Sequence, residues 1–522
     1  MLKWPKRWSL KQRVLLRVSQ GLIDFACCLP KVQRGPLARL QLEGKYARAD
    51  RNHNNTVMPQ GVDLRLLNVV YADLIFVEDF PRLASGLTAL STRFPSWLRR
   101  GDEGEQLERW LKSWGRTGPG VGWHTVCYLD FTRGIAKDGP RWADYAHIRL
   151  IGFAPSAIAV SIVVTPSDLF ARRLRSLLRS QAGERCILRW VRWRPLDFGF
   201  EWHPAWRVRR DEMEDAFLEL QTQAVGLIWG HTKAGLAGGG PLPSVEVFVL
   251  DRSEGSASQD TAETEEARRR ENAFWQSAGM PEDYPFAYRH DWLALRPVDD
   301  IPEDRLSTVW RALVDRKAFL LDTEGTRGFA DDDHKITYLV SERLGLLAPM
   351  LACTEYADRL LRQISALRSE LAPVLVGRNR RRFGLRRLGS VVGRMVRIAS
   401  LDFIVRRMRE EIDYKKAEAL FEREGIPGLA REAPRDHTPT ALVSQMARYL
   451  ERVHQYASGQ LALLKEAYSE IVAFERIKSE QATQSRLLWL TIVLVVLTTV
   501  LTWQVLPDST RAYLLSAVRH LP

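Results

Sequence analysis

The stretch LLWLTIVLVVLTTVLTWQVL, residues 487–506, decides how the rest of the sequence is interpreted. It contains no charged residue, and a helix of its length covers roughly 30 Å, the thickness of the hydrocarbon core of a bilayer. Trp489 and Trp503 lie near its two ends. Because amphipathic rings settle at the lipid headgroups, we expect both to be membrane-interface anchors. The stretch predicts one transmembrane helix.

The flanks of this helix predict its orientation. Residues 507–522 are too few and too polar to cross again, so we expect a single-pass protein with a short C-terminal tail. The N-terminal residues lack the uninterrupted apolar core of a signal peptide, because charges persist to Arg17 and Asp24 divides the apolar stretch. Basic residues precede residue 487. We therefore expect the bulk of the chain to be cytoplasmic, at the cell (inner) membrane.

The overall charge is strongly positive. The 522 residues hold 76 Lys and Arg against 63 Asp and Glu, a formal net charge of +13. Such a balance favours an anionic partner, either a membrane surface or nucleic acid. The five cysteines form no C-x-x-C pattern, which indicates reduced thiols and gives no metal site.

Residues 1–56 form a basic N-terminal segment. Leu10, Val14, Val18 and Leu22 recur at helical spacing. The pattern predicts an amphipathic helix, which either packs on the following domain or lies on a membrane surface.

Residues 57–334 predict a cytoplasmic α+β domain. Several strand-like runs occur, and three of them follow one another, which favours a mixed or antiparallel sheet over a doubly wound one. Residues 251–272 contain almost no apolar side chain and read as a disordered loop. Helical patterns appear near 167–182, 210–224 and 302–318. The expected strands are WHTVCYLDF (123–131), YAHIRLIGF (145–153), AIAVSIVVTP (157–166), ILRWVRWRP (187–195) and SVEVFVLD (244–251).

Residues 335–486 predict a helical stalk of three long helices. The first runs from near Lys335 to Leu371 and stops at Pro373, and the second covers about forty residues around 388–412. A turn rich in glycine and proline follows at 425–439. The third begins near Thr440 and continues straight into 487–506.

An antiparallel arrangement of these helices returns the loop near 373–384 to the membrane surface. Eight arginines and no acidic residue lie between 378 and 397, so we expect this segment to contact anionic lipid headgroups. Nucleic acid, or a solvated turn bridged to acidic neighbours, are the alternatives. The arginines are Arg378, Arg380, Arg381, Arg382, Arg386, Arg387, Arg394 and Arg397.

The order of parts, a cytoplasmic α/β region followed by a long helical stalk and a span, resembles the CorA-type magnesium transporters over residues 335–506. The Gly-Met-Asn signature of that family and its second span are absent, and WQVLPDST stands after the apolar run instead. The resemblance implies a homo-oligomeric stalk and carries over no functional residue.

Other motifs give weaker signals. The glycine-rich stretch GHTKAGLAGGG (230–240) is more typical of a flexible hairpin loop than of a phosphate cradle, because no G-K-[ST] follows. DDDH (331–334) fits the N-terminal cap of a helix better than a cation site.

RWVRWRP (189–195) suits strand packing better than single-stranded nucleic-acid binding. The scattered histidines (His124, His147, His203, His231 and His290) read as structural. No catalytic residue, metal site or cofactor is indicated.

These observations favour a membrane-anchored sensor or interaction module on an oligomeric stalk. A diverged CorA-like ion channel or transporter is the first alternative, with Thr491, Thr498 and Thr502 facing a pore. A membrane-tethered enzyme of unrevealed class is the second.

Overall fold

The computed structural model describes residues 25, 62–76, 79–94, 122–132, 140–154, 157–180, 182, 185–190, 198–203, 205–232, 242–252, 275–280, 286–290, 292–298, 309–323, 328–329, 331–345, 347–375, 422–425 and 442–505. The chain divides into two compact units. The first contains the described residues up to Arg359 together with β11 and the start of α13, through His454. The second contains the rest of α10 from Leu360 and the rest of α13 from Gln455.

A mixed nine-stranded sheet forms the centre of the first unit. The strand order is β11-β8-β9-β10-β7-β1-β4-β3-β2. Strands β7 and β10 pair in parallel, and the other described neighbours are antiparallel. The strands are β1 (Val62–Phe76), β2 (Gly122–Asp130), β3 (Ala143–Ala154), β4 (Ala157–Pro166), β7 (Ser244–Arg252), β8 (Phe286–His290), β9 (Leu293–Pro297), β10 (Val309–Asp315) and β11 (Glu422–Gly425).

The expected α+β class and mixed sheet are confirmed, together with strands at β2, β3, β4 and β7. The expected strand at 187–195 is present as β5 (Arg185–Trp190), which pairs with β6 (Phe198–His203) in a separate two-stranded sheet.

The longest strand, β1, was not foreseen. It lies between β7 and β4 and pairs with both. Its two faces are both buried, from Leu66 through Ile75. A strand covered on both sides reads as a nearly continuous apolar run without clean alternation, which explains why its pattern is weak in the sequence.

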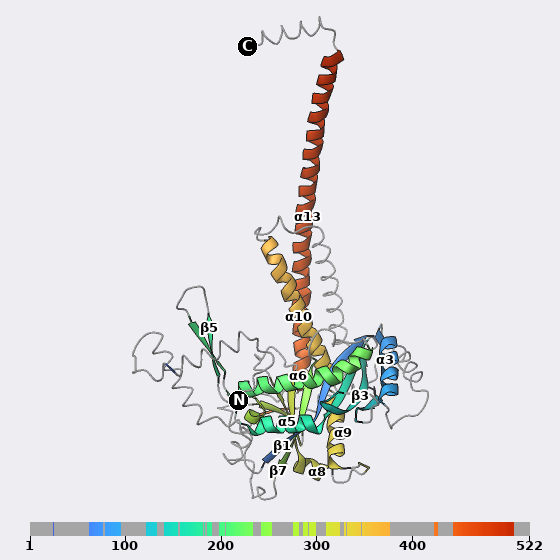
Figure 1. Ribbon diagram of the computed structural model, residues 1–522, viewed down its shortest axis with the longest axis vertical. Coiled ribbons are helices and arrows are strands. Elements are labelled where there is room, and N and C mark those ends of the chain that lie inside the picture. The colour runs from blue at the N-terminus through green and yellow to red at the C-terminus, as the bar shows by residue number, and fades with distance from the viewer. Residues whose placement is uncertain are drawn as a thin grey trace. The chain divides into compact units, whose positions relative to one another are not determined.

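Helices α3 (Phe80–Arg93), α5 (Asp168–Arg179) and α6 (Ala205–Thr232) cover one face of the sheet, and Figure 1 shows α5 and α6 lying across it. Ser167 caps α5 by accepting the Phe170 N–H, at 3.4 Å. The core packs through aromatic contacts: Phe217 lies 6.0 Å from Phe170 and 6.5 Å from Phe248, between ring centroids. The helices predicted near 167–182 and 210–224 are thus present as α5 and α6, although α5 ends at Arg179 and α6 extends from Ala205 to Thr232.

Side chains at every second position of the strands point to the other face of the sheet. Helices α8 (Arg316–Asp322), α9 (Asp332–Gly345) and the first part of α10 (Ala348–Leu375) lie on that face. The Tyr356 ring of α10 contacts Phe76 of β1 at 5.6 Å. The Arg149 guanidinium of β3 lies 5.4 Å from the centre of the Tyr338 ring of α9. The sheet is therefore buried between two helical layers.

The helix expected at 302–318 is wrong where the structure describes it. Residues 309–315 form β10 and only the segment from Arg316 is helical. A short apolar run such as VWRALVD does not distinguish a buried strand from a buried helix by its periodicity.

The helix expected from Lys335 to Leu371 is two helices. Helix α9 ends at Gly345, and α10 begins at Ala348 with Pro349 in its first turn. Proline is favoured there because its missing N–H is unpaired in any first turn, whereas it would break a continuous helix. Pro373 does not end α10, which continues to Leu375.

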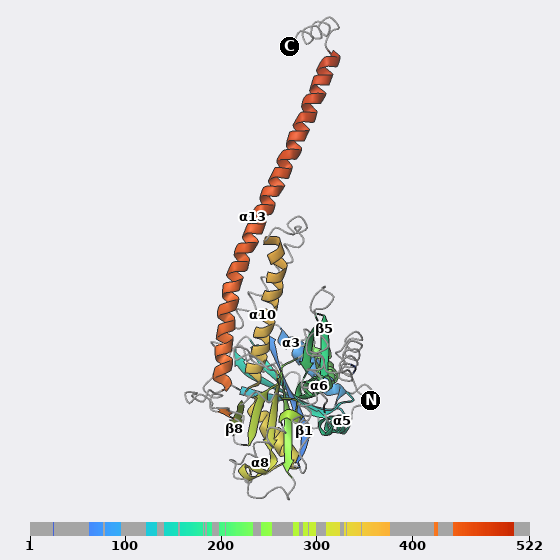
Figure 2. The same ribbon diagram turned by 90° about the vertical axis from the view of Figure 1, so that its left-hand side faces the viewer.

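Helix α13 (Leu442–Val505) is one element of 64 residues, as the sequence predicted from near Thr440 (Figure 2). In the first unit, Leu442, Met446 and Leu450 are buried. In the second unit, Ala457, Leu461 and Leu464 are buried, and so are Leu360, Ile364 and Leu367 of α10. The helix expected at 388–412, the N-terminal helix and the loop at 251–272 fall on residues outside those described, apart from the strand residues 251 and 252.

Candidate functional site

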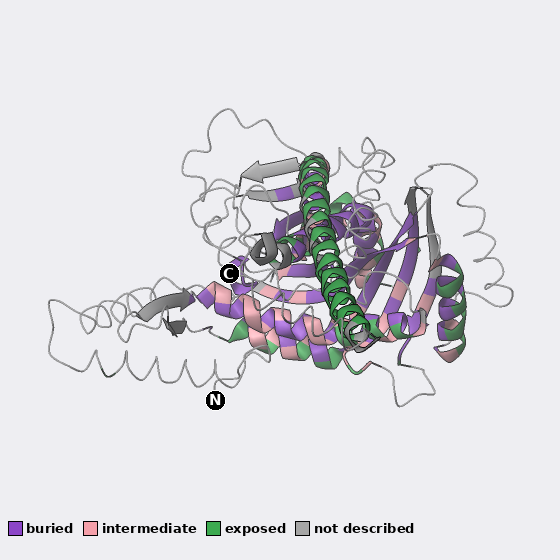
Figure 3. Cartoon of the chain, turned by 90° about the horizontal axis from the view of Figure 1, so that it is seen from above, coloured by how far each residue is buried: buried purple, intermediate pink, exposed green. Residues whose placement is uncertain are grey.

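The apolar part of α13, Glu480–Val500, is the feature that separates this helix from the others. It has a mean hydropathy of 1.5, and none of it is buried. Eleven large apolar side chains between 487 and 500 are each 44 to 67% exposed. Figure 3 colours this length of the helix as exposed. Water-soluble proteins rarely expose a contiguous apolar surface of this extent.

Of the threonines predicted to face a pore, Thr491 and Thr498 lie on this part of α13 and Thr502 lies just beyond it. The Thr491 hydroxyl donates to the Leu487 carbonyl at 2.9 Å, and the Thr498 hydroxyl to the Leu494 carbonyl at 2.8 Å. The Thr502 hydroxyl donates to the Thr498 carbonyl at 2.7 Å. Each donor is thus satisfied within the helix, which lowers the cost of placing these side chains in lipid.

Of the two predicted tryptophan anchors, only Trp489 has a described side chain. The side chain of Trp489 is 67% exposed on α13. Trp503 belongs to the same helix, and its side chain lies outside the described residues.

A second apolar segment meets the same length and composition test. Helices α9 and α10, taken together over Asp332–Gly345 and Ala348–Ser369, are apolar enough to cross a membrane. Most of their apolar side chains are buried, however, as for Ile336, Val340, Leu344 and Leu351. Among the described residues, only α13 therefore combines sufficient length with complete exposure.

The predicted lipid-contacting arginines, from Arg378 to Arg397, lie outside the described residues. Their contact with a membrane stays a prediction.

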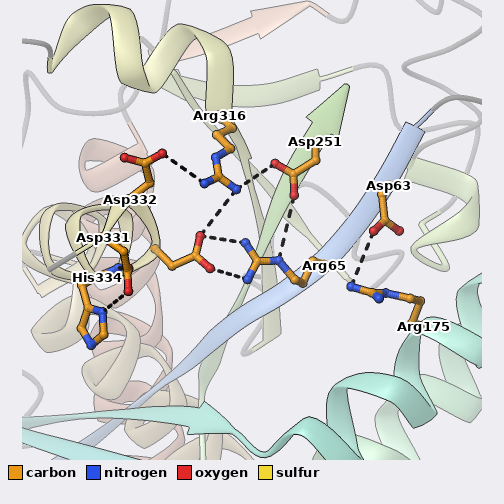
Figure 4. Close-up of polar contacts among 9 residues, drawn as sticks. Asp63, Arg65, Arg175, Asp251, Arg316, Asp331, Asp332 and His334 are labelled. Carbon is orange, nitrogen blue, oxygen red and sulfur yellow. Dashed lines mark hydrogen bonds and ion pairs between the residues drawn. The ribbon is translucent and has the colours of Figure 1, made fainter. Parts of the chain in front are cut away.

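The motif DDDH lies at the start of α9, where Asp331 caps the helix as the sequence favoured. Its side chain accepts the His334 N–H at 2.8 Å and lies 3.0 Å from the His334 ring nitrogen Nδ1. The hydrogen bond from the His334 backbone N–H is the main cause that lowers the pKa of Asp331. Figure 4 shows this pair beside a larger group of charges.

That larger group, which we call the ionic cluster, consists of Arg65, Asp251, Arg316, Asp332 and Asp333. The Arg65 guanidinium donates to both carboxylate oxygens of Asp333, at 2.5 and 2.7 Å. This side-chain hydrogen bond lowers the pKa of Asp333 and raises that of Arg65. Bidentate pairs of this kind are the strongest form of arginine–carboxylate contact.

Arg316 completes the ionic cluster (Figure 4). Its guanidinium lies 3.2 Å from Asp251 and 3.1 Å from Asp332. Arg65 comes from β1, Asp251 from the end of β7, Arg316 from the start of α8 and the two aspartates from the start of α9. The two cations are thus matched by three carboxylates, and the cluster ties α9 to the sheet. No group of three or more His, Cys, Asp or Glu side chains suited to a metal ion occurs within the described part of the chain.

A second ion pair lies inside the sheet. The Arg311 Nε atom of β10 donates to the Glu246 carboxylate of β7 at 2.6 Å, and both side chains are at most 1% exposed. Arg311 also donates to the Ala278 carbonyl. Burial raises the pKa of Glu246 to about 7, against the attraction of Arg311. Both charges point to the face covered by α6, where they hold the turn of residues 275–280 against the sheet.

Gly279 fits this close packing. Its φ of +70° favours glycine, and a Cβ atom there would meet the Arg210 backbone at 2.7 Å.

Three of the five histidines considered in the sequence have described side chains. His147 is half-buried, and burial lowers its pKa to about 3, so it is neutral at physiological pH. His203 is buried, and His231 lies 3.3 Å from Arg93. In GHTKAGLAGGG, residues 230–232 end α6 instead of starting a loop, and residues 233–240 fall outside those described. The side chains of His124, His290 and RWVRWRP are outside them too.

Neither charge group was predicted from the sequence. Their members come from strands and from the first residues of α8 and α9, and Arg65 lies 268 positions from Asp333. The only available signal is the charged residue within an apolar strand, as at Glu246 in SVEVFVLD and Arg311 in VWRALVD, which a partner must neutralise.

No family model, curated protein or solved structure matches the chain.

Proposed function

We propose that the protein is anchored in the cell (inner) membrane by a single crossing of α13. Its α+β domain would lie in the cytoplasm and act as a sensor or interaction module. The observation that supports this proposal is the complete exposure of Glu480–Val500. An apolar helix of 21 residues with no covering layer is stable in lipid and unfavourable in water.

The arrangement of polar groups supports the same proposal. The apolar part of α13 is free of charge from Leu487 onward, and its hydroxyls bond within the helix. Both features lower the cost of transfer into hydrocarbon. Arg486 directly precedes the uncharged run and would remain at the headgroups. The arginines between 378 and 397 would add contacts to anionic lipid.

The sensor or interaction role is proposed for the α+β domain. The described part of the domain offers ion pairs that are matched internally and no metal-binding group. Such ion pairs hold the elements of the domain together, and its binding role is assigned from the membrane anchor and stalk proposed above. The helical path from the sheet through α9 and α10, and the long α13, would form the oligomeric stalk expected from the sequence.

The anchor is tested by placing arginine in the middle of the apolar segment. The variant Leu494→Arg/Leu497→Arg is expected to leave the membrane fraction on alkaline extraction, because each charge costs about 3 kcal/mol at the bilayer centre. The matched control is Val472→Arg, on the same helix but ahead of the apolar segment, which should remain in the membrane. Equal retention of all three proteins would refute a membrane crossing at this site.

A further inference from the structure

Four large apolar side chains are exposed on α13 between Gln455 and Arg486, where the helix is otherwise mainly polar. They are Tyr456, Leu463, Val472 and Ile477, each 39 to 59% exposed. Tyr456, Leu463 and Ile477 are separated by seven and fourteen residues. Seven residues make two turns of a supercoiled helix and fall about 20° short of two turns of a straight one, so these three side chains share one face when two such helices supercoil about each other.

The seven-residue spacing continues into the apolar segment, where the residues at these positions are polar. Gln484, Thr491 and Thr498 follow Ile477 at intervals of seven residues. Thr502 is one turn beyond Thr498 and shares its side of the helix. In a supercoiled pair, one row of α13 would therefore carry mainly apolar residues where the helix is polar, and polar residues where it is apolar.

We call this the heptad face: Tyr456, Leu463, Ile477, Gln484, Thr491, Thr498 and Thr502. All seven residues are exposed, so no described part of the chain covers them. The threonine hydroxyls are held against their own helix by bonds of 2.7 to 2.9 Å. Their small side chains would let a second helix approach closely, with the oxygen lone pairs still able to accept.

We propose that the heptad face binds the heptad face of a second copy of this chain, with the two α13 helices parallel and in register. The proposal rests on the membrane anchor, because copies inserted in one membrane by the same route share one direction. A second copy is the partner whose spacing matches along the whole face. The Gln484 amide carries both donors and an acceptor, so it complements itself across a two-fold axis.

Glu470 occupies the one heptad position that opposes this pairing. In a parallel, in-register pair it faces its own copy, and like charges across a helical interface are unfavourable. The pairing would therefore be weaker than the apolar residues alone allow, and it would tighten when the charge is removed.

The pairing is tested by disulfide cross-linking of the full-length protein in membranes, in a background without the five native cysteines. Leu463→Cys, Thr491→Cys and Thr498→Cys are expected to give cross-linked dimers, because a disulfide requires a short Cα separation. Val493→Cys and Val500→Cys, two residues further along and so on the far side of the helix, should give several-fold less. Alkaline extraction of each variant reports in parallel whether the protein remains in the membrane.

The outcomes separate the two proposals. Equal cross-linking at all positions, or stronger cross-linking at Val493 and Val500, would overturn the pairing while membrane retention upholds the anchor. Loss of membrane retention in every variant would overturn the anchor. Reaction of Thr498→Cys with a membrane-impermeant thiol reagent, without dimer formation, would overturn the pairing in favour of a water-filled pore.

Three substitutions that keep the helix intact refine this test. Thr498→Leu should weaken dimer formation several-fold, because a bulkier side chain keeps the two helices from approaching closely. Thr499→Leu makes the same change beside the heptad face, where the native hydroxyl bonds to the Val495 carbonyl at 2.8 Å, and should change nothing. Glu470→Leu should strengthen the dimer several-fold at low salt.

Discussion

Two apolar helical regions of this protein have similar composition and opposite surroundings. Helix α9 with the first part of α10 has buried side chains such as Ile336, Val340 and Leu351, and it packs on the sheet. The apolar part of α13 exposes its side chains on every side. Composition places both among membrane-crossing candidates, and only the covering layer distinguishes a protein core from a lipid-facing helix.

The polar residues of the two regions explain the difference. The ionic cluster at the start of α9 satisfies Asp332 and Asp333 with Arg316 and Arg65. Such charges can be tolerated at the boundary of a soluble core, where water reaches them. From Leu487 to Val500, α13 carries no charged residue and the hydroxyls of Thr491 and Thr498 bond to its own backbone, an arrangement that suits a membrane.

The largest expected effect comes from the same charge placed in each region. Leu351 is 2% exposed in α10, and Leu494 is 66% exposed in α13. Leu351→Arg should destabilise the α+β domain by more than about 4 kcal/mol, because it buries an unpaired charge. Leu494→Arg should leave the denaturation midpoint of the domain unchanged. The midpoints of both variants in detergent, followed by circular dichroism, check this; equal losses would remove the distinction between the two helices.

A smaller effect tests whether the side chains of α13 are buried near its start and exposed in its apolar part. Met446 is fully buried near the start of this helix, whereas Leu490 is 62% exposed. Met446→Ala should cost about 2–4 kcal/mol of unfolding free energy through the cavity it leaves. Leu490→Ala should cost the domain nothing. Urea unfolding measures both, and a substantial loss in Leu490→Ala would mean that the domain covers the apolar segment.

The smallest effect concerns the ionic cluster that holds α9 on the sheet. The pKa of Asp333 is lowered in the folded protein, so its contribution is present above the ordinary carboxyl pKa near ~4 and is lost as pH falls through the lowered value. Asp333→Asn should therefore lower stability at neutral pH by about 1 kcal/mol or less, since the pair is partly exposed.

The pH profile distinguishes this contribution from a general acid effect. The difference between wild type and Asp333→Asn should shrink as pH falls below the ordinary carboxyl range and vanish below the lowered pKa of Asp333. Asp332→Asn, whose side chain is 48% exposed, should have a smaller effect and serves as the matched control. A difference between wild type and Asp333→Asn that is independent of pH would contradict an ionic contribution.

The elements that the sequence predicted well have strong, local patterns. Helix α13 was predicted almost to its first residue because its apolar positions recur over many turns and then become continuous. Strand β4 was predicted for a similar reason, from its β-branched run. The cap at Asp331 followed from acidic residues directly ahead of a helical pattern.

The elements that were missed depend on tertiary contacts. Strand β1 is buried on both faces, so its alternation is masked, and β10 resembles a short helix for the same reason. The bidentate pair of Arg65 with Asp333 joins residues 268 positions apart. Neither partner differs locally from any other charged surface residue, and only the fold brings them together.

The most direct test of the membrane-crossing claim measures the environment of α13 itself. Spin labels placed at Leu490, Leu494 and Leu497 of the full-length protein in lipid vesicles report collisions with oxygen, which concentrates in hydrocarbon, and with a water-soluble nickel complex. A label at Lys465 provides the reference in water. Oxygen collisions should rise, and nickel collisions should fall, at the three leucines relative to Lys465. Equal nickel accessibility at Leu494 and Lys465 would contradict a membrane crossing by α13.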